Sequence, residues 1–174
     1  MTVPKGWLYQ VTPDNTARFV LGTVGKNPLI CVGVNPSTAT PQKLDPTVTR
    51  VARRAWRNNY DSWIMLNLYP QRSTDPDGMH AQYLPELKAQ NEQRIAELLQ
   101  GRRVTLLAAW GELIEKRDYL PDMLHGIAQI TEQASCGWMS IGAPLKRHHP
   151  RHPSRARYDM GLQSFDMATY VQRL

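Results

Sequence analysis

Four short apolar segments form the clearest pattern along the chain, and residues that favour turns flank each of them. They occupy residues 29–34, 62–68, 104–109 and 138–141. Each segment is too short for a free-standing helix, and most have too few polar positions for a strand with one face in water. The pattern is typical of strands buried on both faces, as in a parallel sheet.

Amphipathic helices are predicted between these strands. Asp45 followed by Pro46 suits an N-cap with proline at the first helical position, and apolar side chains then recur at helical spacing as far as Trp56. This predicts a helix from residue 46 to about residue 58. A second apolar stripe starts at Leu84 and stops before Gly101, as expected at a helix C-terminus.

Two further segments give weaker helical signals. Residues 112–125 have a helical pattern that Pro121 interrupts. Residues 158–174 are predicted to form a last helix. Strands that alternate with helices in this way imply crossover connections and a mostly parallel sheet that is covered on both faces.

The predicted fold is therefore α/β, with three layers in the order α/β/α. We expect one domain spanning residues 1–174, with a central four-stranded, mostly parallel sheet. Residues 7–11 and 17–21 flank the turn-forming sequence at Pro13, which predicts an N-terminal β-hairpin. In such folds ligands bind beyond the carboxyl ends of the strands, where the loops converge.

Composition and charge narrow the class of protein. The chain has 174 residues, enough for one domain with a sizeable core, and its net charge of +6 favours an anionic partner. Cys31 and Cys136 are the only cysteines, which favours a reducing compartment. The sequence has no apolar run typical of a signal peptide, and no segment approaches the ~18 apolar residues of a membrane span. We expect a cytoplasmic monomer without a membrane partner.

Polar residues follow each predicted strand of the sheet. Asn35, Pro36 and Ser37 follow the first strand, Asn67 follows the second, and Trp110 follows the third. An Asn-Pro pair alone would be an ordinary turn. With the loop after the fourth strand, four polar loops lie at one sheet edge, and this favours a ligand site instead. Trp110 is either part of the core or a surface for stacking.

Two basic segments lie near the predicted ligand edge. The loop after the fourth strand has no acidic residue before Asp159, and residues 46–60 also have none. The basic residues of the loop are Lys146, Arg147, Arg151, Arg155 and Arg157, and those of the helix are Arg50, Arg53, Arg54 and Arg57. If helix and loop face the same side they form a phosphate-binding surface; otherwise they are an ordinary solvated face.

The sequence does not favour a metal site or a cofactor. His148, His149 and His152 lie in a proline-interrupted loop and lack the i, i+4 spacing that brings two imidazoles to one ion. The chain also lacks a glycine-rich phosphate loop, a serine nucleophile elbow and a thioredoxin-type cysteine pair. Asn91 falls on the inner stripe of its helix, which predicts a buried amide that holds a loop in place.

An ordered set of motifs covers nearly the whole chain. It comprises Arg18, Asn35-Pro36-Ser37-Thr38-Ala39, Asp45-Pro46-Thr47 with Arg50, Asn67-Leu68-Tyr69 with Arg72 and Thr74, Ala109-Trp110-Gly111, and Arg151-His152-Pro153. This set resembles the bacterial and phage family of domains of unknown function numbered sixteen-forty-three. The resemblance implies no activity.

A second set of motifs is similar to the uracil-DNA glycosylase superfamily. Gly33-Val34-Asn35-Pro36 resembles its water-positioning loop, and Asn67-Leu68-Tyr69-Pro70 resembles the segment whose Asn reads the flipped base. His152-Pro153-Ser154 resembles the loop that enters the minor groove. Ser37 stands where that family has Gly, and Arg155 stands where it usually has Pro.

This second resemblance implies roles for single residues. Asn35 and His152 would be catalytic, with Asn35 holding the attacking water and His152 donating a hydrogen bond to the base oxygen. Asn67 would read the base edge, and Pro36, Ser37 and Trp110 would line the base pocket. A general base would be missing or would have to be Asp45. The residues expected to bind nucleic acid are Arg50, Arg53, Arg72, Lys146, Arg147, Arg151, Ser154, Arg155 and Arg157.

The sequence is compatible with three functions. The first is a nucleic-acid base glycosylase, or a related enzyme that acts on a modified base. The second is a non-catalytic DNA- or nucleotide-binding module on the same scaffold. The third is a nucleotide-processing enzyme whose small substrate uses the pocket and leaves the basic face unused.

Overall fold

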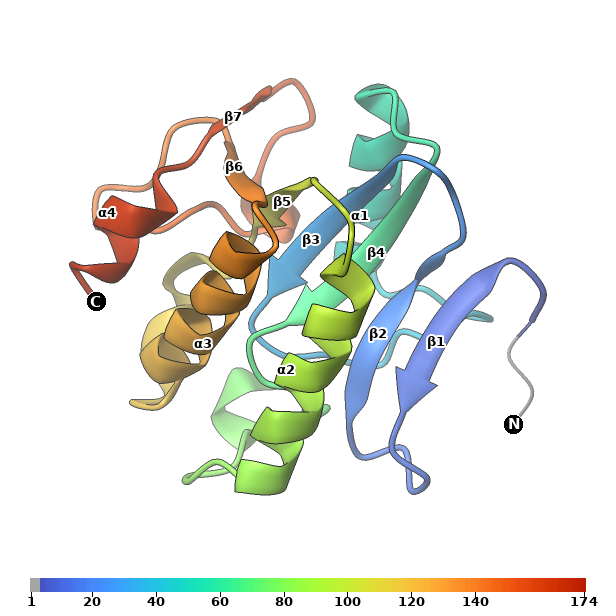
Figure 1. Ribbon diagram of the computed structural model, residues 1–174, viewed down its shortest axis with the longest axis vertical. Helices are drawn as coiled ribbons and strands as arrows, with labels where there is room; N and C mark the ends of the chain where they lie inside the picture. Colours follow the sequence, from blue (N-terminus) through green and yellow to red (C-terminus); the bar gives the residue numbers. More distant parts are fainter. Residues whose placement is uncertain (1–3) are drawn as a thin grey trace.

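A computed structural model of the protein describes residues 4–174 and contains one mixed sheet of seven strands (Figure 1). The strand order is β1-β2-β4-β3-β5-β6-β7. The central strands β4, β3, β5 and β6 are parallel, and β2, β1 and β7 add to them in antiparallel pairs. The bounds are β1 Trp7–Val11, β2 Arg18–Thr23, β3 Pro28–Gly33, β4 Ser62–Asn67, β5 Thr105–Ala108, β6 Gly137–Ile141 and β7 Leu162–Ser164.

The expected four-stranded sheet is wrong in its strand number, although the four apolar segments do form the four parallel strands. The N-terminal hairpin is confirmed, and it extends the sheet because Leu21 of β2 pairs with Met65 of β4. Strands β1 and β7 each have at least one exposed residue and most of their other residues only partly buried. They therefore lack the continuous apolar pattern by which a fully buried strand is identified in a sequence.

The expected helix over residues 158–174 is also wrong. This segment forms strand β7 and then a short helix, α4 (Met167–Val171). Strand β7 covers the free edge of β6, with Ile141 paired to Leu162 and Met139 paired to Ser164. Pairing the exposed edge of β6 satisfies backbone groups that a helix would leave open.

Two helix predictions are confirmed and one is corrected. Helix α1 (Pro46–Arg57) begins at its Asp45 cap, whose Oδ1 accepts a hydrogen bond from the Val48 amide at 2.8 Å. Helix α2 (Pro85–Leu99) ends before Gly101. Pro121 does not interrupt a helix: it lies in the first turn of α3 (Leu120–Gln133), where proline needs no hydrogen bond. A 3₁₀ segment, η2 (Gly111–Lys116), precedes it.

Helices cover both faces of the sheet and give the expected three layers (Figure 1). Ile30 and Val32 of β3 belong to a core with α2 and α3, whereas Leu29 and Cys31 belong to a core with α1. Helix α1 packs through Val48, Val51 and Ala55. Trp56 is an exception to the predicted stripe, because it lies at the border of the apolar face and is 79% exposed. In residues 4–174 no helix has the length and apolar character needed to span a membrane.

Candidate functional site

A polar cavity of about 330 Å³ lies at the carboxyl ends of β3 and β4, beside the start of α1. The loops after these strands and the loop before the 3₁₀ segment η3 (Pro153–Arg155) meet there. Its lining includes Arg18, Gly33, Asn35, Ser37, Asp45, Asn67, Ser73, Thr74 and His152. The cavity therefore brings together Asn35, Ser37, Asn67 and His152 from three separate segments of the chain.

Asn67 ends strand β4, where it is paired with Gly33 at the end of β3. Its side chain is 2% exposed, and its Nδ2 has no hydrogen-bond partner. Gly33 makes room for this amide, because a Cβ at position 33 would lie 3.2 Å from Asn67 Oδ1. A buried amide without partners is costly, so a ligand that pairs with it gains the full value of the hydrogen bond.

Asn91 of α2 holds the end of strand β4 through its side-chain amide. As predicted, its amide is buried, and Nδ2 donates to the Asn67 carbonyl at 2.9 Å and to the Leu68 carbonyl at 3.2 Å. Both carbonyls lie where β4 stops and its backbone loses its sheet partners. Asn91 thus holds the backbone from which the Asn67 side chain projects.

Asn35 connects two loops of the cavity wall. Its Nδ2 donates to the Ser73 carbonyl at 2.9 Å and to the Pro36 carbonyl at 3.1 Å, and the Ser73 amide donates to the same Pro36 carbonyl at 2.8 Å. The amide nitrogen of Asn35 is therefore committed to the protein. Its Oδ1 is left to accept a hydrogen bond from water or a ligand.

His152 contributes an imidazole with a defined tautomer. Nδ1 accepts a hydrogen bond from the Ser154 amide at 3.3 Å and lies 2.7 Å from Ser154 Oγ. Burial, followed by the charge of Arg155, lowers the pKa of His152 to about 4. The ring is therefore neutral at pH 7, and its proton is on Nε2, which makes Nε2–H a hydrogen-bond donor.

The lowered pKa of His152 predicts a pH dependence of stability. Between about pH 4 and 6.5 the unfolded chain binds the proton and the folded protein does not, so the free energy of unfolding rises with pH across this window. One such group gives a slope of up to about 1.4 kcal/mol per pH unit. Chemical denaturation of wild type and His152→Asn from pH 4 to 7 measures it. Equal slopes in the two proteins would contradict the assignment.

Gly111 supports the His152 backbone from the start of η2. Its φ is +60°, and a Cβ there would lie 3.2 Å from His152 Cβ. Gly111→Ala is expected to cost about 1–2 kcal/mol of stability through the left-handed backbone and to displace His152 as well. Gly101→Ala is the matched control, because Gly101 has φ +70° and no atom within 4 Å of the added Cβ.

The two glycine variants separate the strain of a left-handed backbone, which both share, from the displacement of His152, which only Gly111→Ala causes. Both are expected to lower the thermal midpoint, whereas ligand binding in the cavity weakens only in Gly111→Ala. Thermal unfolding and a binding isotherm measure the two effects. Equal binding by both variants would show that His152 does not depend on this contact.

Arg18 is the site residue that the sequence argument did not place in the site. It begins β2, is 1% exposed, and donates from Nη1 to the Ala39 carbonyl at 3.0 Å, while its Nε has no partner. Among the described residues no carboxylate forms an ion pair with it. Burial, followed by the charge of Arg72, lowers the pKa of Arg18 to about 10, so the side chain stays charged at pH 7. In the sequence, the one sign of this role is that Arg18 interrupts the otherwise apolar run 17–21.

Asp45 is the one carboxylate among the described residues that line the cavity. Its Oδ1 caps α1 through the Val48 amide. The carboxylate acts on the pKa values of Arg18 and His152 in the opposite direction to burial, raising both. The cavity thus has a buried cation, a carboxylate and a neutral imidazole donor on its walls.

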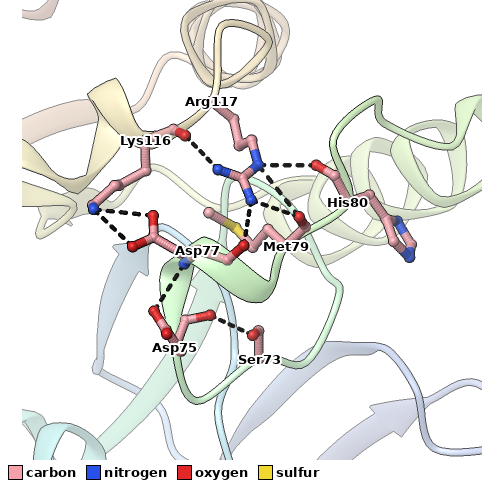
Figure 2. Close-up of polar contacts among 7 residues, drawn as sticks. All are labelled: Ser73, Asp75, Asp77, Met79, His80, Lys116 and Arg117. Atoms are coloured by element: carbon pink, nitrogen blue, oxygen red, sulfur yellow. Dashed lines mark hydrogen bonds and ion pairs between the residues drawn. The ribbon is translucent and has the colours of Figure 1, made fainter.

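The segment after β4 is fixed by two basic side chains of η2 and the following turn (Figure 2). Arg117 donates from Nε to the His80 carbonyl at 3.1 Å and from Nη2 to the Met79 carbonyl at 2.8 Å. Lys116 pairs with Asp77 at 3.0 Å. Because Ser73 and Thr74 line the cavity, these contacts hold one of its walls in place.

Arg72 and Trp110 have structural contacts in place of the expected ligand contacts. Arg72 donates to the Ser37 carbonyl at 2.5 Å and to Tyr9 Oη at 2.8 Å, so it braces the loop after β3. Trp110 is fully buried in the core, where its Nε1 donates to Tyr170 Oη at 3.0 Å. It offers no face to a base, and this placement corrects the expectation of stacking. Pro36 does not line the cavity either.

A second cavity, of about 650 Å³, adjoins the first at Pro76, Leu113 and His152. Arg151, Ser154 and Arg155 are among the residues that line it. Three of the expected nucleic-acid contacts therefore lie next to the polar cavity, whereas Arg147 pairs with Glu115 at 2.6 Å and Arg157 pairs with Asp159. Lys146 is exposed.

Helix α1 and the basic loop lie on the same side of the molecule. Arg54 is buried and donates to the Met160 carbonyl at 2.7 Å and to the Arg157 carbonyl at 2.9 Å, and Arg50 donates to the Ala156 carbonyl at 3.3 Å. Arg54 is thus a structural tie, while Arg53 points into solvent. The two basic segments are therefore in direct contact.

Fold and site together define an α/β/α protein with a small polar pocket at the carboxyl edge of its parallel strands. The chain belongs to the family described as "Protein of unknown function (DUF1643)", whose model matches residues 18–154. That range runs from Arg18 to Ser154 and includes every residue named above as lining the polar cavity. Searches of the curated proteins and of the solved structures found no significant match.

Proposed function

We propose that this protein is a nucleic-acid base glycosylase-like hydrolase, which cleaves the N-glycosidic bond of a modified base turned into the polar cavity. The observation that carries the proposal is the Asn67 amide, which is 2% exposed, lines the cavity and has an unpartnered Nδ2. An amide offers a donor and an acceptor side by side, which matches the hydrogen-bonding edge of a nucleobase.

The size of the cavity supports a base as its occupant. About 330 Å³ is near the lower end of the range for ligand sites, about 300–1,000 Å³. This space suits a base, with the sugar and phosphates outside. The adjoining cavity is the expected place for the phosphates, because Arg151 and Arg155 outweigh Glu112 in its lining, where Lys116 is already paired.

The chemistry of the walls fits hydrolysis. The C1′–N bond breaks with its electron pair going to the base, a bond forms from C1′ to water, and the proton lost by that water finally resides on the base. The Nε2–H of His152 and the cation of Arg18 are suited to the negative charge that develops on the base. Asn35 Oδ1 and the second oxygen of Asp45 are suited to hold the water.

One observation favours a non-catalytic DNA- or nucleotide-binding module as a second candidate. Asn35 Nδ2 and Asp45 Oδ1 both make protein hydrogen bonds, so each side chain has only one oxygen for a water molecule. A binding module needs Asn67, His152 and Arg18 for recognition but no positioned water. Its binding would weaken with salt and would not be followed by base release.

The test is base release from oligonucleotides that carry one altered base each. Single- and double-stranded substrates with uracil, hydroxymethyluracil, hypoxanthine, or oxidised or alkylated bases are incubated with the protein, and alkali then cleaves the abasic strand. Strand cleavage with one of these substrates supports the proposal and names the base. Salt-sensitive binding without cleavage of any substrate selects the binding module.

A further inference from the structure

A third cavity, lined by aromatic side chains, lies at the far end of α1, away from the polar cavity. It measures about 660 Å³ and is lined in part by Trp56, Tyr60, Trp63 and Tyr158. Trp56 is 79% exposed, which makes it the most exposed large apolar side chain among the described residues. An indole on a helix surface gains nothing from this exposure in the free protein.

Cations surround this cavity. Arg53 and Arg57 line it, and neither of them takes part in an ion pair within residues 4–174. Arg57 and Arg50 also lie over the Tyr158 ring, with their guanidinium carbons 5.8 and 5.1 Å from its centroid. These contacts align the arginines along the exposed face of the helix.

The one acidic side chain in the lining is already occupied. Asp61 accepts hydrogen bonds from the Lys26 amide at 2.8 Å, the Asn27 amide at 2.9 Å and Ser62 Oγ at 2.7 Å. It holds the turn before β4, and these hydrogen bonds lower the pKa of Asp61, so it stays ionised; Arg53 and Arg57 still leave the lining with a net positive charge. The cavity therefore combines aromatic faces with unpaired positive charge, which are the two elements of sites for single-stranded nucleic acid.

Helix α1 connects this aromatic cavity to the polar cavity. Its first turn, from Pro46 to Val48, lines the polar cavity, and Trp56 lies eight residues beyond Val48. Eight to ten residues of α-helix span about 12–15 Å, which corresponds to about four nucleotides of a stacked strand. Arg53 is exposed on the helix between the two sites and Arg57 is exposed at the aromatic end, whereas Arg50 is half-buried against Ala156.

We propose that a single nucleic-acid strand runs along α1, with one base stacked on Trp56 and its phosphates on Arg53 and Arg57, while a base about four nucleotides away enters the polar cavity. This inference rests on the proposed function for the identity of the second base. It adds that the substrate is a strand and not a free nucleotide. An unpaired strand is required because base faces inside a duplex are covered by their neighbours.

The test is a binding series with labelled oligothymidylates of two to eight nucleotides. For the eight-nucleotide strand, Trp56→Ala is expected to raise Kd by about 5- to 100-fold, whereas Trp56→Phe retains a stacking face and stays within about threefold of wild type. The dinucleotide cannot reach both sites, so wild type is expected to bind it more weakly than the eight-nucleotide strand.

The salt dependence tests the arginines separately. Arg53→Gln and Arg57→Gln are each expected to reduce the slope of log K against log salt by about 0.7, the value for one phosphate contact on a single strand. Arg94→Gln, on α2 in the opposite layer, is the matched control and leaves the slope unchanged. Unchanged slopes in all three variants overturn the proposed path.

The outcomes separate this inference from the proposed function. Equal affinity of wild type and Trp56→Ala for the eight-nucleotide strand overturns the inference, even if base release is observed. Trp56-dependent binding supports it, even if no base is released from any substrate. Polyglutamate is the competing ligand. If it binds as tightly as the oligonucleotide and this binding is lost in Trp56→Ala, the partner is an acidic polypeptide and the inference is overturned.

Discussion

Replacing His152 by alanine is expected to lower base release at pH 7 by about 10²–10³-fold, the cost of removing one preorganised donor to a developing anion. The neutral ring, with a pKa of about 4, presents Nε2–H as a donor, because Nδ1 accepts from the Ser154 amide. The variant keeps the fold, because the side chain is only partly buried and belongs to neither apolar core. Single-turnover base release measures the effect.

Ser154→Ala is the matched control for this prediction. It removes the hydroxyl 2.7 Å from His152 Nδ1 but leaves the backbone amide that fixes the tautomer. We expect base release to fall by less than tenfold in this variant. A large loss of thermal stability in His152→Ala, or an unchanged rate, would contradict a catalytic role and assign the residue to the loop structure.

Arg18→Met is expected to stabilise the protein by about 1–3 kcal/mol while lowering base release or base binding by about 10²-fold. A pKa of about 10 instead of 12.5 means that burial, together with the charge of Arg72, costs on the order of 3 kcal/mol for the charged side chain in the free protein. An apolar side chain of similar length removes this cost. The Ala39 carbonyl keeps a partner, because Arg72 Nη1 also lies within 3.3 Å of it.

Opposite changes in stability and function distinguish a ligand-binding cation from a structural one. Denaturant unfolding and base release are measured on the same preparation, with Arg18→Lys as the conservative control. We expect the lysine variant to retain part of the function, because it keeps the charge without the planar donors. A variant Arg18→Met that is both less stable and fully active would show that Arg18 serves the fold alone.

The sequence predicted the parallel strands and the first helix well because their signals are local. The segments 29–34 and 62–68 are apolar on both faces, and Asp45-Pro46 fixes the start of α1 through its cap. The N-terminal hairpin was predicted but its place in the main sheet was not, and β7 was missed, because β1 and β7 are at most partly buried. Their side chains follow no continuous apolar pattern, and the edges they pair with come from elsewhere in the chain.

The candidate site was predicted in part for a similar reason. Asn35, Asn67 and His152 were found because each follows a strand or an Asn-Pro or His-Pro motif that is visible in the sequence. Arg18 and Trp56 were not, because their meaning depends on exposure: one is a fully buried cation and the other is an indole in solvent. Burial of a single long side chain is not encoded in the residues next to it.

The sequence by itself determined the four parallel strands with helices α1 and α2 between them, the three layers, and the edge of the sheet where polar loops gather. Periodicity and capping act over a few residues, so they can be read from one segment at a time. Only the tertiary structure decided that Arg72 and Arg54 are braces while Arg18 faces the cavity. Long polar side chains take partners from distant segments, and the same residue type becomes a structural tie or a free ligand contact according to which carbonyls lie within its reach.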